Sequence, residues 1–174
     1  MTVLVRKFDV FIMLFINKYL RNKYLDIFMC IMTKLGNMGA VWIAIAIYSL
    51  MDKQYRYEGK VVLSTLIIST IIGEGVLKNL IKRSRPFDAE KNVKLLITKP
   101  ISYSFPSGHA LSSFAVAGVL SVYFAKYELI FIGLAFFIAI SRIYLCVHYT
   151  TDVIGGIAIG LICSKFILVV LNFK

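Results

Sequence analysis

Apolar stretches separated by short polar segments make up most of this chain. Four stretches long enough to cross a bilayer lie at residues 61–81, 108–125, 129–147 and 152–172, since a transmembrane helix needs about 20 mostly apolar residues. None of the four contains a proline, a residue that interrupts helices. The pattern therefore predicts four membrane-spanning helices after residue 60.

The N-terminal third is less regular. The run Val10–Ile16 is too short to span a bilayer and is flanked by charged residues, which favours an interfacial or tilted helix. The next run is interrupted by Asp26, whereas Met38–Met51 reaches spanning length by joining the turn before it. We expect interfacial or short helices over residues 1–35. For the whole chain we expect one domain, residues 1–174, with an all-α fold: a polytopic membrane helix bundle of five to six transmembrane helices.

One long polar loop, residues 82–105, separates the predicted helices, and all three prolines of the chain lie in it or next to it. The order of the helices places this loop and the link 148–151 on one membrane face. The loops 52–60 and 126–128 then lie on the other face. Both faces carry basic residues, so the positive-inside rule does not assign the orientation.

Composition narrows the class of protein. Hydrophobic residues make up 59% of the chain and charged residues 17%, and the mean hydropathy is +0.81, which disfavours both a soluble globule and a disordered chain. The net charge of +11 suits membrane topology, anionic headgroups or an anionic substrate. A nucleic-acid partner is not expected, because no soluble basic arm or face exists. The three cysteines lie in apolar stretches without metal-ligand spacing or a disulfide pattern.

The first motif with candidate chemistry runs from Lys78 to Arg85-Pro86. Lys78 and Arg85 are seven residues apart, so on a continuous helix they share a face, and both residue types bind phosphate. The alternative is a collar of basic residues at a helix end, which is how we interpret Lys82 and Arg83. Lys78 could also pair with Glu74 at the i,i+4 spacing.

The second motif is Pro106-Ser107-Gly108-His109, which opens the helix predicted at 108–125. Ser107 suits an N-cap, and Gly108 lets a ligand approach the backbone closely. Amide groups of a first helical turn bind anions. An ordinary capped helix would explain Ser107 but not His109, which shares the loop face with His148, the other histidine of the chain.

The third motif is Ser141-Arg142, followed by His148 and then Asp152. A carboxylate bonded to one imidazole nitrogen fixes the tautomer and leaves the other nitrogen as a nucleophile. Asp152 could instead cap the last helix, or do both. Arg142 within a membrane helix is costly unless it meets an anion or a carboxylate. Neither histidine has a second ligand at metal spacing, so we expect no metal site and no cofactor.

Taken together, the motifs describe a phosphate site with a nucleophile and a proton donor, in which Lys78, Arg85 and Arg142 supply the positive charge. In this order and spacing they resemble the signature of the type 2 phosphatidic acid phosphatase family, and every fixed residue of the signature between residues 78 and 152 is present. Vanadium haloperoxidases share that signature but are soluble, which this composition disfavours.

The resemblance implies a metal-independent phosphatase that works through a phosphohistidine. His148 would attack phosphorus, with Asp152 orienting it, and His109 would protonate the leaving oxygen and then activate water. The phosphoryl oxygens would be held by the cations and by the backbone of Ser107 and Gly108.

The resemblance further implies a lipid phosphate substrate. The preferred one is undecaprenyl diphosphate, converted to the undecaprenyl phosphate used in cell-wall synthesis; phosphatidylglycerol phosphate or phosphatidic acid is the alternative. It also implies a multi-pass protein of the cell membrane, with the site on the extracytoplasmic face. No obligate protein partner is inferred from the sequence. A non-catalytic lipid-phosphate binder or transporter is the alternative of another class.

Overall fold

The structure is a computed structural model that describes residues 3–89 and 95–171 of the 174. Residues 90–94 of the predicted polar loop lie outside the described residues. Every regular element in the described part of the chain is a helix. In chain order these are α1 (Val3–Phe15), η1 (Ile16–Leu20), α2 (Lys23–Gly36), η2 (Asn37–Gly39), α3 (Ala40–Met51), α4 (Arg56–Thr70), η3 (Ile71–Leu77), α5 (Lys78–Ile81), α6 (Pro86–Ala89), α7 (Gly108–Tyr123), η4 (Ala125–Tyr127), α8 (Glu128–Tyr144) and α9 (Thr150–Val170).

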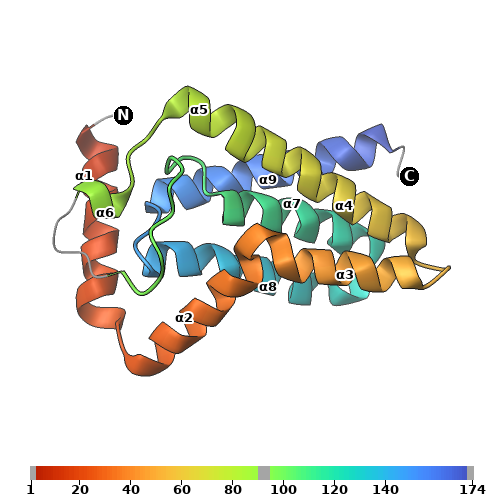
Figure 1. Cartoon of the computed structure of the whole chain (residues 1–174), viewed down its shortest axis with the longest axis horizontal. Helices are drawn as coiled ribbons and strands as arrows, with labels where there is room; N and C mark the ends of the chain where they lie inside the picture. Colours follow the sequence, from red (N-terminus) through yellow and green to blue (C-terminus); the bar gives the residue numbers. More distant parts are fainter. Residues whose placement is uncertain (1–2, 90–94, 172–174) are drawn as a thin grey trace.

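Four helical segments are long and apolar enough to cross a membrane: Lys23–Met51, Arg56–Ala89, Ala125–Tyr144 and Thr150–Val170. A fifth apolar helix, Gly108–Tyr123, is shorter. The prediction of an all-helical membrane bundle is confirmed. The first of these segments bends between α2 and α3 (Figure 1), where Met38 and Gly39 both adopt positive φ values of 51° and 71°.

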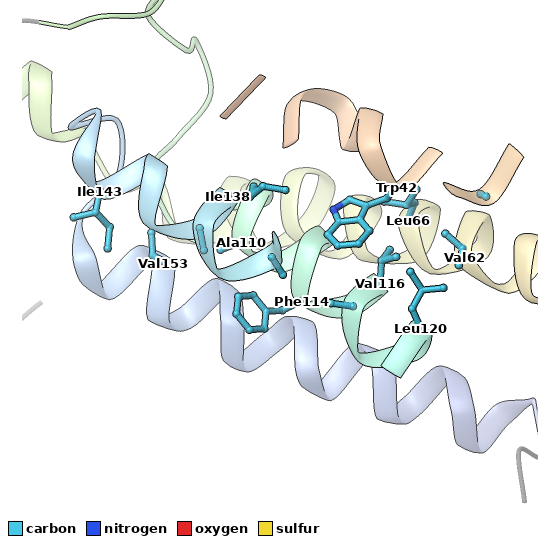
Figure 2. Close-up of a cluster of buried hydrophobic side chains, with 14 residues drawn as sticks. Trp42, Val62, Leu66, Ala110, Phe114, Val116, Leu120, Ile138, Ile143 and Val153 are labelled. Carbon is cyan, nitrogen blue, oxygen red and sulfur yellow. The ribbon is translucent and has the colours of Figure 1, made fainter. Parts of the chain in front are cut away.

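Helix α7 lies at the centre of the bundle and packs against α4, α8 and α9. Its apolar residues meet those of the neighbouring helices in the main core, where the ring of Trp42 from α3 lies beside Leu66 (Figure 2). Trp42 is fully buried, and its indole Nε1 donates to Oγ of Ser113 on α7 over 3.0 Å. This bond satisfies the one polar atom of the indole ring, so burying the ring leaves no N–H group without a hydrogen-bond partner.

Helices α7 and α9 approach each other very closely because of two glycines on α9. A Cβ atom on Gly156 would lie 2.7 Å from the carbonyl oxygen of Ser107, and one on Gly160 would lie 2.5 Å from that of Leu111. The backbone N–H of Ser107 donates to the carbonyl of Asp152 over 3.1 Å. These contacts hold the N-terminal ends of the two helices side by side.

Helix α1 lies across the end of the bundle rather than along it (Figure 1). It has 13 residues, and its buried residues are Asp9 and Met13. Several of its large apolar side chains are exposed, among them Leu4 and Phe11. Helix α1 therefore covers the end of the bundle that holds the long loop and the link between α8 and α9.

The close approach of α7 and α9 predicts that Gly160→Ala destabilises the protein. The added methyl group meets main-chain atoms that cannot move aside, and overpacking of this kind costs about 1–3 kcal/mol. The matched control is Gly133→Ala on α8, where an added Cβ meets nothing within 4 Å and helix propensity gains about 1 kcal/mol. The midpoint of thermal unfolding in detergent should fall for the first variant only. Equal midpoints would show that this contact does not limit stability.

Candidate active site

The three sequence motifs meet at the end of the bundle that α1 covers. The segment 95–107, the short link between α8 and α9, and the first turns of α7 and α9 all lie there (Figure 1). The loop between α3 and α4 and the turn between α7 and α8 lie at the opposite end (Figure 1). The arrangement of loops on two faces is therefore the one expected from the order of the helices.

His148 lies in the link between α8 and α9, and its side chain is 2% exposed. Its Nδ1 is 2.7 Å from the carbonyl oxygen of Ser104, and its Nε2 is 3.2 Å from Nη1 of Arg85. A carbonyl oxygen can only accept and a guanidinium can only donate. The proton of the neutral ring therefore lies on Nδ1, and Nε2 carries a lone pair.

Asp152 does not make the direct bond to His148 that the sequence suggested. Its Oδ2 is 3.8 Å from Nδ1 of the histidine. The same oxygen accepts from Oγ of Ser104 over 2.6 Å and from the backbone N–H of Tyr149 over 2.9 Å. Asp152 thus caps α9 and also holds Ser104, the residue whose carbonyl fixes the imidazole.

The environment of His148 disfavours its charged form. Burial and the positive charges of Arg142, Arg85 and Lys78 hold the pKa of the imidazole well below its ordinary value of 6.5. The ring is therefore neutral at neutral pH, which is the state in which Nε2 can act as a nucleophile.

Lys78 and Arg85 do not share a helix face. Helix α5 ends at Ile81 because Lys82 adopts a left-handed conformation with φ 48°, so Arg85 lies beyond the helix. Ser102 brings the two cations together instead. Its Oγ accepts from Nζ of Lys78 over 2.9 Å and from Nη2 of Arg85 over 3.2 Å.

The guanidinium of Arg85 is held from three sides by main-chain oxygens. Nε donates to the carbonyl of Ser102 over 2.6 Å, and Nη1 donates to that of Val147 over 2.7 Å. Nη2 also donates to the carbonyl of Tyr103, over 3.3 Å. These bonds connect the loop before α7 to the link that carries His148. They fix the direction of the guanidinium, and none of them neutralises its charge.

Two fixed residues of the three motifs have buried polar atoms without a hydrogen-bond partner in the described part of the chain. Arg142 is 3% exposed and bonds through Nη1 to Oγ1 of Thr33, while its Nε has no hydrogen-bond partner and it forms no ion pair with a described carboxylate. Ser107 occupies the N-cap position of α7, but its buried hydroxyl makes no capping bond and no other hydrogen bond to a described residue. A buried cation and a free hydroxyl suit an anion with several oxygens.

Gly108 begins α7 directly under the side chain of Glu74. A Cβ atom at this position would fall on the carboxylate of Glu74, which pairs with Nζ of Lys78 over 2.6 Å. The i,i+4 pair proposed from the sequence is therefore present, and it coexists with the bond from Lys78 to Ser102. An anion that binds Lys78 has to compete with Glu74.

His109 lies in the first turn of α7 and faces η2. Its Nε2 is 2.9 Å from Oδ1 of Asn37. A cavity of about 330 Å³ opens beside it, lined by Glu74 and by small residues that include Gly73, Gly108 and Ser112. Small side chains at this place leave room for a ligand between α4, η2 and α7.

Arg83 is not part of a basic collar. Its side chain is 11% exposed and forms two ion pairs, with Asp9 over 2.7 Å and with Asp152 over 2.5 Å. Its guanidinium also lies over the ring of Tyr149, 4.2 Å from the centroid. The snorkelling interpretation failed because the sequence does not show that α1 brings a second carboxylate to this point.

Sequence reasoning also missed Ser104, Asp9 and Asn37. Ser104 acts through its main-chain carbonyl, which any residue could supply, so no sequence signal marks it. Asn37 is recognisable only from its contact with His109. Asp9 did carry a signal, because an acidic residue between apolar positions of a short helix is costly to bury without a partner.

The depressed pKa of His148 predicts a pH dependence of stability. Below about pH 6.5 the unfolded chain binds a proton at this residue that the folded protein does not, so stability falls as pH falls. The free energy of unfolding of the wild-type protein in detergent should fall between about pH 7.5 and 5 more steeply than that of His148→Asn, by up to about 1.4 kcal/mol per pH unit. Both proteins retain His109, so the difference isolates His148. Parallel pH profiles would contradict the depressed pKa.

Comparison with known proteins connects this geometry to a family. A family profile described as the PAP2 superfamily matches residues 59–174. The chain is 35% identical over 122 residues to an undecaprenyl-diphosphatase of Sulfolobus acidocaldarius. That match covers 69% of this chain but 58% of the relative, which is less than two thirds of the relative's own length.

Two solved structures share the fold over most of this chain. One is a transmembrane PAP2 type phosphatidylglycerolphosphate phosphatase from Bacillus subtilis, with a TM-score of 0.79 and 26% identity, covering 99% of this chain and 89% of that chain. The other is Aquifex aeolicus LpxE, with a TM-score of 0.80 and 30% identity, covering 92% and 94%. The resemblance inferred from the three motifs is thereby confirmed, and the chain belongs to the PAP2 superfamily.

Proposed function

We propose that this protein is a membrane lipid phosphatase that works through a phosphohistidine at His148. One observation carries the proposal: Nδ1 of the buried imidazole donates to a carbonyl, so the lone pair of Nε2 faces a group of buried cations. A neutral nucleophile beside a binding site for phosphoryl oxygens is what phosphoryl transfer needs.

In the first step, the lone pair of Nε2 of His148 attacks phosphorus and the bond from phosphorus to the leaving oxygen breaks. The phosphoryl oxygens would lie among Lys78, Arg85 and Arg142. Ser107 would contribute its unpartnered hydroxyl rather than its N–H, because that N–H already donates to the carbonyl of Asp152. The first-turn amides of α7, beginning at Gly108, would add further donors.

His109, in its protonated imidazolium form, would supply the proton that the leaving oxygen requires and so become the neutral base of the second step. Its Nε2 lies against Oδ1 of Asn37, an amide oxygen that accepts the proton of this ring nitrogen until a leaving group replaces it. In the second step His109 removes a proton from water, the water oxygen attacks phosphorus, and the phosphorus–nitrogen bond breaks. Inorganic phosphate leaves and His148 regains its lone pair.

Asp152 would orient His148 through Ser104 rather than by direct contact. As Nε2 bonds to phosphorus, the ring gains positive charge and Nδ1 donates more strongly to the carbonyl of Ser104. The carboxylate of Asp152, 3.8 Å from Nδ1, stabilises that charge at short range.

The preferred substrate is undecaprenyl diphosphate, which hydrolysis converts to undecaprenyl phosphate. The relative named undecaprenyl-diphosphatase supports this choice, whereas the Bacillus subtilis structure supports phosphatidylglycerol phosphate as the alternative. The cavity beside His109 and Gly108 lies between membrane helices. This location suits the headgroup of either membrane lipid. By the family resemblance, we place the site on the extracytoplasmic face of the cell membrane.

A lipid-phosphate binder or transporter would also use the uncompensated charge of Arg142. It would have no use for a histidine whose Nδ1 is held by Ser104 and whose Nε2 faces the cations. A measurement of substrate hydrolysis therefore distinguishes a phosphatase from a binder or transporter.

The test is phosphate release by the purified protein in detergent, with a metal chelator present. Undecaprenyl diphosphate and phosphatidylglycerol phosphate are offered side by side. We expect chelator-resistant release from one of them and a loss of at least about 10³-fold in His148→Ala, with the unfolding midpoint and phosphate affinity of the variant showing that it folds and binds.

The outcomes separate the parts of the proposal. Full turnover by folded His148→Ala would exclude the phosphohistidine. Release that the chelator abolishes would exclude the metal-independent mechanism. Binding of both lipids without release would favour the binder.

Arg142→Ala should raise KM and lower kcat together, because this buried charge serves both the bound phosphate and the transition state. We expect a loss of about 10²–10³-fold in kcat/KM, the size seen when one stabilising donor is removed. The matched control is Arg56→Ala, an exposed arginine at the opposite end of the bundle. An unchanged KM in the first variant would mean that Arg142 does not contact the bound substrate.

A further inference from the structure

Asp9 is a fully buried carboxylate on a helix that is otherwise largely exposed. Its Oδ1 accepts from the backbone N–H of Thr151 over 3.0 Å. Its Oδ2 accepts from Oγ1 of Thr151 over 2.6 Å and from Nη2 of Arg83 over 2.7 Å. Both oxygens are thus directed at the first turn of α9 and at the loop before α6. The residue lies outside the family match, which begins at residue 59.

Arg83 joins Asp9 to Asp152. While Nη2 donates to Asp9, Nη1 donates to Oδ1 of Asp152 over 2.5 Å and to Oγ1 of Thr151 over 2.8 Å. One guanidinium therefore binds two buried carboxylates at once, a geometry for which the planar fork of arginine is suited and the single ammonium of lysine is not.

Beyond Asp152, the chain of contacts continues to the histidine. Oδ2 of Asp152 accepts from Oγ of Ser104, and the carbonyl of Ser104 accepts from Nδ1 of His148. Every bond in this series joins segments that are far apart in the sequence, from α1 through the loops to α9. Asp9 is therefore connected to the imidazole of His148 through three intervening residues, Arg83, Asp152 and Ser104.

We propose that Asp9 is a positioning residue of the active site, which acts through Arg83 and Asp152 on His148; this inference rests on the proposed function. Two carboxylates that share one guanidinium carry a net negative charge beside the imidazole. That charge stabilises the positive charge that develops on the ring as Nε2 bonds to phosphorus. Asp9 also keeps Arg83 from moving wholly onto Asp152, where it would cancel the charge that faces the histidine.

Asp9 touches neither the cations nor the hydroxyl that would hold the substrate. Its loss should therefore affect the chemical step and leave substrate binding nearly unchanged. This separates a positioning role from general damage to the site, which would change kcat and KM together.

The experiment compares Asp9→Asn with Asp52→Asn in the full-length protein, with phosphate release measured on whichever lipid the wild type hydrolyses. Asp52 lies exposed at the opposite end of the bundle, so the control makes the same chemical change away from the site. We expect Asp9→Asn to lower kcat about tenfold or more with KM within about twofold, and the control to change neither. Wild-type kcat in folded Asp9→Asn would overturn the inference.

Arg83→Lys keeps the test decisive if Asp9→Asn folds poorly, and a double-mutant cycle extends the test if Asp9→Asn folds. Arg83→Lys preserves the charge but loses the two separate nitrogens that reach Asp9 and Asp152, so it should lower kcat and leave KM within about twofold. Adding Asp9→Asn to it should cost less than the same change in the wild type, because neighbouring groups in one network are not additive. Full additivity, or an Arg83→Lys enzyme with wild-type kcat, would overturn the inference. If the wild type itself releases no phosphate, the proposed function fails, and the inference falls with it.

Discussion

Burial of Asp152 is the constraint on which the architecture of this site depends. A carboxylate taken out of water needs partners for both oxygens, and here they come from three separate segments. Arg83 binds Oδ1, while Ser104 and the backbone N–H of Tyr149 bind Oδ2. Satisfying this one group therefore ties the loop before α7 to the start of α9, and the carbonyl of Ser104 in that loop binds His148.

The distribution of charge divides the molecule into two parts. The middle of the bundle is an apolar core around Trp42 and Phe114 (Figure 2), where packing requires only complementary shape. The end beneath α1 holds buried cations that are not matched in number by the carboxylates near them, and Arg142 lacks an acidic partner in the described part of the chain. Such an excess is costly in a protein interior, and the phosphate group of the proposed substrate would relieve it.

Close helix packing and the chemistry of the site are linked through α7 and α9. Gly156 and Gly160 let α9 lie directly against α7, so that the amide-rich start of one helix stands beside the acidic start of the other. The N–H of Ser107 donates to the carbonyl of Asp152 across this contact. The geometry of the candidate site thus depends on main-chain contacts several residues deeper in the bundle.

The sequence by itself determined the class of the fold, and it predicted the members of the proposed phosphate site, because apolar length and motif spacing depend only on residue order. It did not determine how those members are connected. The shared face proposed for Lys78 and Arg85 was wrong because one left-handed residue, Lys82, ends the helix between them. The direct pairing of His148 with Asp152 was replaced by a carbonyl of Ser104, and Arg83 became a bridge to Asp9. These contacts join residues 44 and 74 positions apart in the sequence. Residue order does not fix which distant polar group pairs with a buried charge, so only the tertiary structure decides it.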